Sequence, residues 1–162
     1  MKKLFLLCLI VMSLSSVCFA EIAQNRVAIG GIHWHDSLKR VKSILGEPTK
    51  ILYNKGSING ESPRDMSWIQ YGKKFNVFFL VREDVAVDIQ TSNPIYATPD
   101  GVSPGMAATT LTEVYGKADR VRQAHGGTLY SYFSKTADGE YNVLEFDVRN
   151  GLIYQIEIHI KH

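Results

Sequence analysis

The stretch EYNVLEFDVRNGLIYQIEIHI, residues 140–160, decides the fold of this chain. Apolar and polar residues alternate on both sides of Asn150-Gly151, and an Asn-Gly pair between two alternating runs is a strong hairpin signal. Because a strand places successive side chains on opposite faces, the stretch predicts two antiparallel strands, 140–148 and 152–160.

The alternation also assigns the two faces of the predicted sheet. The inward set, expected to pack against a helix, consists of Leu144, Phe146, Val148, Tyr154, Ile156, Ile158 and Ile160. The outward set consists of Glu145, Asp147, Gln155, Glu157 and His159. The same reasoning over 85–91 turns Val85, Val87 and Ile89 inward and Ala86, Asp88 and Gln90 outward.

Six further runs have strand character, which gives each half of the chain a meander of four strands. They cover 49–54, 66–71, 74–82, 85–91, 119–124 and 128–134. A loop from Asn54 to Asp65 is rich in Gly, Ser, Asn and Pro, and a linker at 93–98 separates the halves.

A helix is expected before each meander, because two segments seventy residues apart share an apolar pattern that closes on a glycine. In the first segment Leu38, Val41 and Leu45 form one stripe of a 3.6-residue period. Asp36 or Ser37 suits the N-cap. In the second segment Leu111 and Val114 take the places of Val41 and Ile44, and Gly46 and Gly116 suit the helix ends.

The predicted fold class is therefore α+β, with two tandem repeats, each a helical segment packed on a four-stranded antiparallel sheet. The predicted boundaries are a signal peptide at 1–20, a first repeat at 21–92, the linker at 93–98 and a second repeat at 99–162.

A helix introduced by Gly-Met, closed by Gly and followed by a four-stranded meander resembles the β-lactamase inhibitory protein-like architecture. That architecture also includes small outer-membrane assembly lipoproteins. The best match runs from Val102-Ser103-Pro104-Gly105-Met106 to Tyr115-Gly116-Lys117-Ala118-Asp119. The first copy departs from it, since His35 and Asp36 stand where Gly-Met would be. The resemblance implies a binding or inhibitor role, with the partner gripped by the sheet face and its loops.

Residues 1–20 are expected to be a cleavable secretory signal. Met1-Lys2-Lys3 is a positive start, an apolar run follows from Leu4 to Met12, and Cys18 and Ala20 supply the small residues that signal peptidase accepts. Cleavage between Ala20 and Glu21 delivers the protein to the periplasm or the medium. A lipid anchor on Cys18 is disfavoured by the bulky Val17 before it, and no stable membrane span is expected after cleavage.

Cleavage changes the composition of the working protein. Both cysteines, Cys8 and Cys18, leave with the signal, which excludes a disulfide, a thiolate metal site and a cysteine nucleophile. Loss of Lys2 and Lys3 leaves sixteen basic residues against sixteen acidic ones. This balance argues against nucleic acid or an anionic membrane surface as partner, and no cofactor is expected.

Two groups of residues invite a chemical hypothesis. His33 and His35 lie at i and i+2 and would share a face of an extended segment, but a third metal ligand is missing, so a polar loop is the favoured interpretation. Glu145, Asp147, Glu157 and His159 are expected to cluster on the open sheet face. A carboxylate near a histidine suits acid–base catalysis, but no nucleophile or enclosed cleft is indicated.

Aromatic residues in or beside loops and outer strands favour a protein-binding surface, because Tyr and Trp are enriched at interface hot spots. The predicted partner-binding set is Trp68, Tyr71, Asp88, Tyr130, Tyr132, Glu145, Asp147, Glu157 and His159. We therefore expect a non-enzymatic binder of another envelope or secreted protein, one version of which inhibits an exported enzyme. The alternatives are an envelope-assembly factor and a small hydrolase or metal-dependent enzyme.

Overall fold

The structure is a computed structural model that describes residues 21–53, 66–80, 83–124 and 126–161. The predicted signal segment and its cleavage residue Ala20 lie outside the described residues, as does the predicted loop 54–65. From Glu21 the chain runs directly onto the body: Ile22 is buried, and its amide donates to the carbonyl of Phe133 at 3.1 Å.

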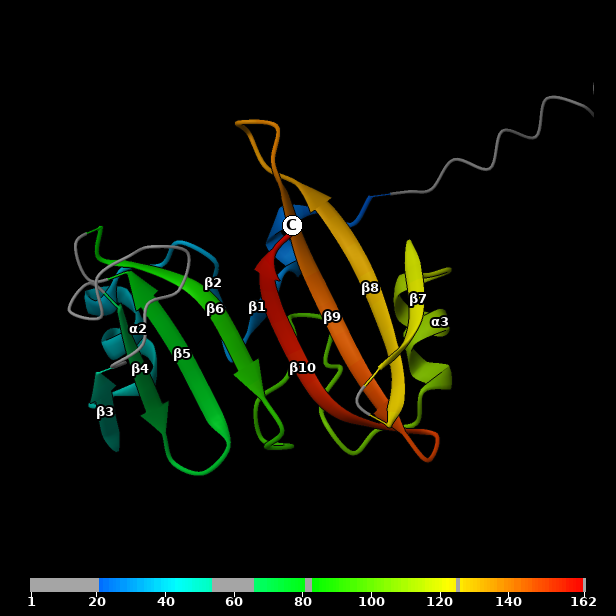
Figure 1. Cartoon of the computed structure of the whole chain (residues 1–162), viewed down its shortest axis with the longest axis horizontal. Coiled ribbons are helices and arrows are strands. Elements are labelled where there is room, and N and C mark those ends of the chain that lie inside the picture. Colours follow the sequence, from blue (N-terminus) through cyan, green and yellow to red (C-terminus); the bar gives the residue numbers. More distant parts are fainter. Residues whose placement is uncertain (1–20, 54–65, 81–82, 125, 162) are drawn as a thin grey trace, which may run out of the picture.

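A single antiparallel sheet of eight strands dominates the fold (Figure 1). Its strand order is β3-β4-β5-β6-β10-β9-β8-β7. The strands are β3 (Lys50–Tyr53), β4 (Met66–Tyr71), β5 (Phe75–Leu80), β6 (Val85–Thr91), β7 (Arg120–Ala124), β8 (Gly127–Lys135), β9 (Tyr141–Arg149) and β10 (Leu152–Ile160). All eight predicted strands are confirmed in the described residues, where their ends agree with the expected ones to within one residue. The predicted strand residues 54, 81 and 82 lie outside the described residues.

The predicted fold class, two α+β repeats each with its own sheet, is wrong. The last strands of the two meanders, β6 and β10, pair with each other through Ile156↔Thr91, Glu157↔Gln90 and Ile158↔Ile89. This pairing satisfies two strand edges that would otherwise stay open, and it fuses the meanders into one sheet. The two α-helices among the described residues are short, α2 (Leu38–Leu45) and α3 (Thr109–Tyr115), so this part of the protein is mostly β.

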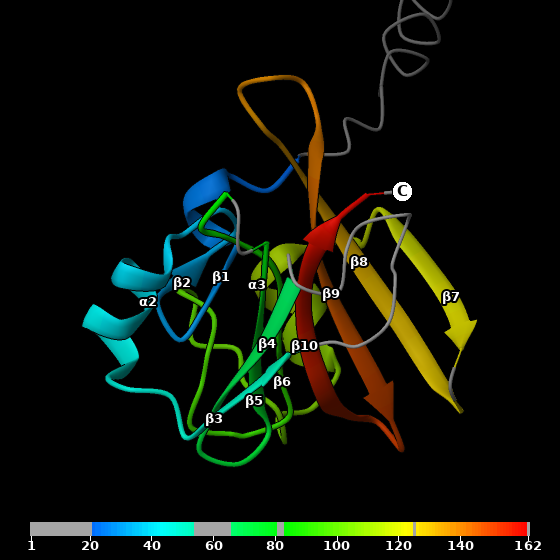
Figure 2. The same cartoon turned by 60° about the vertical axis from the view of Figure 1, so that its left-hand side comes forward.

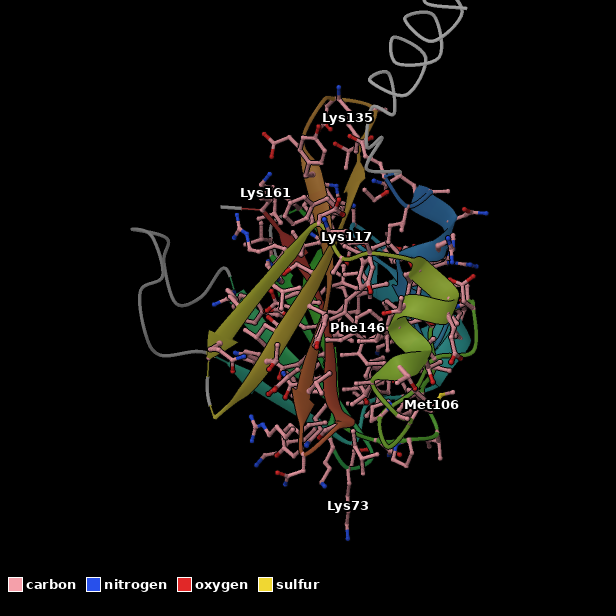
Figure 3. The ribbon with its side chains drawn as sticks, turned by 90° about the vertical axis from the view of Figure 1, so that its right-hand side faces the viewer. Lys73, Met106, Lys117, Lys135, Phe146 and Lys161 are labelled. Atoms are coloured by element: carbon pink, nitrogen blue, oxygen red, sulfur yellow. The ribbon has the colours of Figure 1, made fainter. Side chains whose placement is uncertain are left out.

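One face of the sheet is covered, and the core lies beneath the cover (Figure 2). The cover consists of α2, α3, the short helix η1 (Gln24–Arg26), and a small sheet of β1 (Ala28–Ile29) and β2 (Ile32–His33). Phe146 lies between β9 and α3 (Figure 3) and is fully buried. As expected, Ser37 caps α2 by accepting from the amide of Arg40, and Val41 is buried.

Two β-bulges interrupt the alternation on which the face assignments rest. In β10 the register shifts between Ile153 and Gln155, so Ile153 is buried and Tyr154, predicted to point inward, is exposed. In β6 the register shifts so that Ala86 pairs with the buried Phe79. The inward assignment of Val85 and the outward assignment of Ala86 are therefore wrong, because a bulge inserts one extra residue and reverses the faces on one side of it.

Within the described part of the chain, no helix has both the length and the apolar character that crossing a bilayer requires.

Candidate functional site

The uncovered face of the sheet carries polar side chains in neighbouring rows on β6 to β10. Cross-strand pairing sets the rows: Glu145 of β9 lies directly opposite Glu157 of β10 and, on its other side, opposite Ser131 of β8. Asp147 lies opposite Gln155 in the next row. Directly opposite residues on one face have Cβ atoms about 5 Å apart, so these side chains contact one another.

The rows surround a hollow of about 420 Å³ in the C-terminal half of this face. Strands β7 to β10 supply its lining, which consists of Arg122, Leu129, Glu145, Asp147, Arg149, Gln155, Glu157 and His159. We call this the charged hollow. The structure thus brings together the four predicted residues Glu145, Asp147, Glu157 and His159.

Two of the three carboxylates in the charged hollow are paired with arginine. Glu145 is 8 % exposed; it accepts from the hydroxyl of Ser131 at 2.7 Å and from Arg122 at 3.2 Å. Asp147 is equally buried and accepts from Nη2 of Arg149 at 2.7 Å and from its Nε at 3.0 Å. Such charge-assisted hydrogen bonds are stronger than those between neutral groups.

Glu157 is the third carboxylate of the charged hollow, and it is not paired with an arginine in the way that Glu145 and Asp147 are. It accepts a hydrogen bond from the Gln155 amide at 3.3 Å, and the described residues place no lysine or arginine within ion-pair distance of it. Burial raises the pKa of Glu157, and the negative charge of Glu145 raises it further, whereas the nearby His159, the hydrogen bond from Gln155 and the more distant Arg122 lower it. Like charges directly opposite each other on a sheet are destabilising.

Asp88 extends this negative region onto β6. Burial raises the pKa of Asp88 to about 7, and the charge of Glu157 adds to that rise. Its Oδ1 atom is buried without a hydrogen-bond partner, as is Oδ1 of Asp147. A buried carboxylate oxygen without a hydrogen-bond donor costs stability.

The structure does not place all of the aromatic residues predicted to bind a partner at the surface. Tyr71 and Tyr132 are each 2 % exposed and belong to the hydrophobic core, so their assignment to a binding surface is wrong. The reason is strand alternation: Tyr71 follows the buried Ile69 on the core face of β4. Tyr130 is half-buried and packs against the same core.

Trp68 remains on the uncovered face. It is half-buried, and its ring centroid lies 4.9 Å from that of Phe78. Trp68 pairs with Phe78 and Phe78 with Asp88, so the three side chains share one face of the N-terminal half. They place an aromatic pair beside the negative region.

His33 and His35 are not arranged as a metal site. His35 adopts a left-handed backbone, with φ of 67°, so the segment turns and does not present both histidines on one extended face. Its ring stacks on Trp34 at 3.4 Å, while Nδ1 of His33 lies 3.8 Å from Asp36. In the described residues, no group of three or more His, Cys, Asp or Glu side chains is arranged to hold a metal ion.

The sequence prediction missed the residues that complete the charged hollow. Arg122 comes from the edge strand β7, Leu129 and Ser131 from β8, and Arg149 from the end of β9. Alternation within β7 and β8 offers a weak signal, because Leu129, Ser131 and Phe133 form one set of alternate residues. It could not reveal that Ser131 would lie opposite Glu145, since that depends on strand pairing.

Comparisons with known proteins add little. No protein-family model matches the chain, and no curated protein matches it. One similar solved structure is the crystal structure of a DUF4309 family protein (YjgB) from Bacillus subtilis subsp. subtilis str. 168. The two are 14% identical over 87% of this chain and 88% of that chain, with a TM-score of 0.42. A likeness this distant carries no argument, and the resemblance to β-lactamase inhibitory protein-like architecture stays a prediction.

Proposed function

We propose that this chain is an exported, non-enzymatic binding protein whose charged hollow holds a positively charged side chain of a partner protein. The observation that carries the proposal is the position of Glu157, half-buried directly opposite Glu145, with no lysine or arginine of the described residues paired with it. A lysine ammonium or an arginine guanidinium inserted between the two carboxylates would relieve their repulsion and supply the missing donor.

The surroundings of Glu157 suit such a guest. A hollow of about 420 Å³ has room for the end of a long side chain. Arg122 and Arg149 are already paired with Glu145 and Asp147, so they hold the walls in place and leave Glu157 as the acceptor. Trp68 on the neighbouring half, which is half-buried and packs on the buried Phe78, would give the partner an apolar contact beside its charge.

The partner would meet this protein in the periplasm or the medium. Inhibition of an exported enzyme is one form that such binding could take, and assistance in envelope assembly is another. In both, an arginine or lysine of the partner is the recognised group.

We expect Glu157→Gln to weaken binding of a cationic probe about tenfold or more, because a charge-assisted hydrogen bond contributes roughly 1.5–3 kcal/mol. The probes are N-acetyl-lysine amide and N-acetyl-arginine amide, titrated into the purified protein while amide resonances of β9 and β10 are followed by NMR. N-acetyl-norleucine amide has no charge and should shift none of these resonances.

Glu113→Gln is the matched control, since it makes the same chemical change on an exposed residue of α3. It should bind the probes as the unaltered protein does. The same variants then enter a crosslinking pull-down from the native envelope, in which a genuine partner is captured by the Glu113 variant and lost by the Glu157 variant. Equal capture by both variants would refute the role of the charged hollow.

A small hydrolase is the second candidate, because a half-buried glutamate with a raised pKa beside a histidine is also what a general acid needs. The Glu157→Gln variant separates the two functions. A hydrolase would keep substrate affinity and lose turnover, whereas the proposed binder loses affinity.

A further inference from the structure

A second surface lies at the end of the sheet where β4 meets β5 and β9 meets β10. In Figure 1 these two turns lie at the lower end of the molecule, with the loop that follows β6. Lys73 projects from this end in Figure 3, whereas Lys135 lies at the opposite end. We call this surface the turn end and define it by Lys73, Lys74, Pro94, Ile95, Arg149, Leu152 and Tyr154.

The turn end holds half of the large apolar side chains that the described residues expose. Ile95 is 74% exposed, Leu152 49% and Tyr154 46%. A shallow hollow of about 480 Å³ lies there, and its lining includes Pro94, Leu152 and Tyr154. Exposed apolar groups that gather at one place mark a protein-interaction or membrane-interaction site.

The charge at the turn end is of one sign. Lys73 and Lys74 lie in it beside Arg149, which is paired with Asp147 at 2.7 Å. The four segments that build it, 71–75, 92–95, 103–106 and 149–154, contain no aspartate or glutamate. The opposite end carries carboxylates in its turns, such as Glu83 and Asp138. The segments of the turn end are therefore basic, although acidic and basic residues are equal in number over residues 21–162.

The turns are fixed to one another, so the exposed groups are held in place. The Asn93 side chain donates to the carbonyl of Lys73 at 3.0 Å, and the amide of Ile95 donates to Oδ1 of Asn93 at 3.2 Å. On the other side, Gly105 donates to the carbonyl of Ile153 at 2.7 Å. The guanidinium of Arg149 lies 3.8 Å from the centre of the Tyr154 ring.

We propose that the turn end docks the protein on an anionic phospholipid surface. Aliphatic side chains on turn tips can enter the interfacial region, tyrosine favours the same depth, and lysines beside them face the headgroups. This combination fits a lipid surface better than an acidic protein, which would offer no layer for Ile95 and Leu152 to enter. The docking is peripheral and reversible.

Vesicle sedimentation of the purified protein tests the proposal. We expect binding to vesicles that mix phosphatidylglycerol with phosphatidylcholine, weak binding to phosphatidylcholine alone, and loss of binding as salt is raised. Ile95→Ser combined with Leu152→Ser should lower the partition coefficient about tenfold, and Lys73→Gln combined with Lys74→Gln should lower it by a similar factor.

Ile51→Ser combined with Val121→Ser is the matched control, because these residues are 44% and 55% exposed on the two edge strands. This control should bind vesicles as the unaltered protein does. A second measurement uses tryptophan variants that should keep their binding. The fluorescence of Leu152→Trp should shift to the blue when anionic vesicles are added, and the fluorescence of Val121→Trp should not. Equal binding to both kinds of vesicle, or equal losses in the control, would overturn the proposal.

Discussion

Replacement of Gly127 by alanine is expected to lower the free energy of unfolding by roughly 3 kcal/mol or more. A Cβ atom at this position would lie 2.5 Å from the carbonyl oxygen of Val148, 2.7 Å from Oδ1 of Asp147 and 2.9 Å from Cγ of Arg149. The first contact is with backbone, so relief requires β8 and β9 to separate where they pair. Urea denaturation of both proteins measures the effect.

Gly126 provides the control, because it is the neighbouring glycine and has open space around its Cβ position. Its φ of 77° makes Gly126→Ala cost only about 1 kcal/mol of backbone strain. Equal destabilisation by the two substitutions would mean that the contact of residue 127 with β9 costs no more than the backbone strain at 126. The added Cβ atom would also displace Oδ1 of Asp147, so we expect Gly127→Ala to disturb the charged hollow.

Local pattern predicted the strands well, because alternation and turn residues act over a few residues. It placed Glu145 and Asp147 together with Glu157 and His159, since the Asn150-Gly151 hairpin fixes the register between β9 and β10. It failed at Tyr154, where a bulge reverses the face, and nothing in the residue types of 152–156 marks the extra residue.

The local sequence pattern could not predict which strands distant in the sequence would pair. The joint between β6 and β10 brings Gln90 opposite Glu157, residues far apart in the sequence, and turns two expected sheets into one. The position of Asp88 beside Glu157 depends on that joint. The partners Arg122 and Ser131 depend in the same way on β7 and β8, so the composition of the charged hollow follows from topology rather than from any motif.

The joint has an energetic consequence that Asp88→Asn should expose. The folded chain raises the pKa of Asp88 from its ordinary value of 3.8 to about 7, so between these values the folded state holds a proton that the unfolded state releases. The folded state is therefore favoured most below pH 4, and this contribution is lost as the pH rises toward 7.

We expect Asp88→Asn to stabilise the protein at pH 8 by about 2 kcal/mol, well below the value from the full pKa difference, because solvent and relaxation reduce the cost of burial. At pH 4 the two proteins should differ little, since the carboxyl is then protonated and neutral in the folded state. Urea denaturation at the two pH values measures the change, and Glu113→Gln, an exposed carboxylate outside the site, should show no such dependence.

A second variant, Glu157→Gln, tests the link between Asp88 and Glu157. Because the charge of Glu157 contributes to the raised pKa of Asp88, Glu157→Gln should lower the pKa of Asp88 in an NMR titration of its carboxyl carbon. An unchanged titration would leave burial as the whole cause and would separate Asp88 from the charged hollow. A lowered pKa would mean that one buried negative region spans β6, β10 and β9, at a cost in stability that binding of a cationic group would offset.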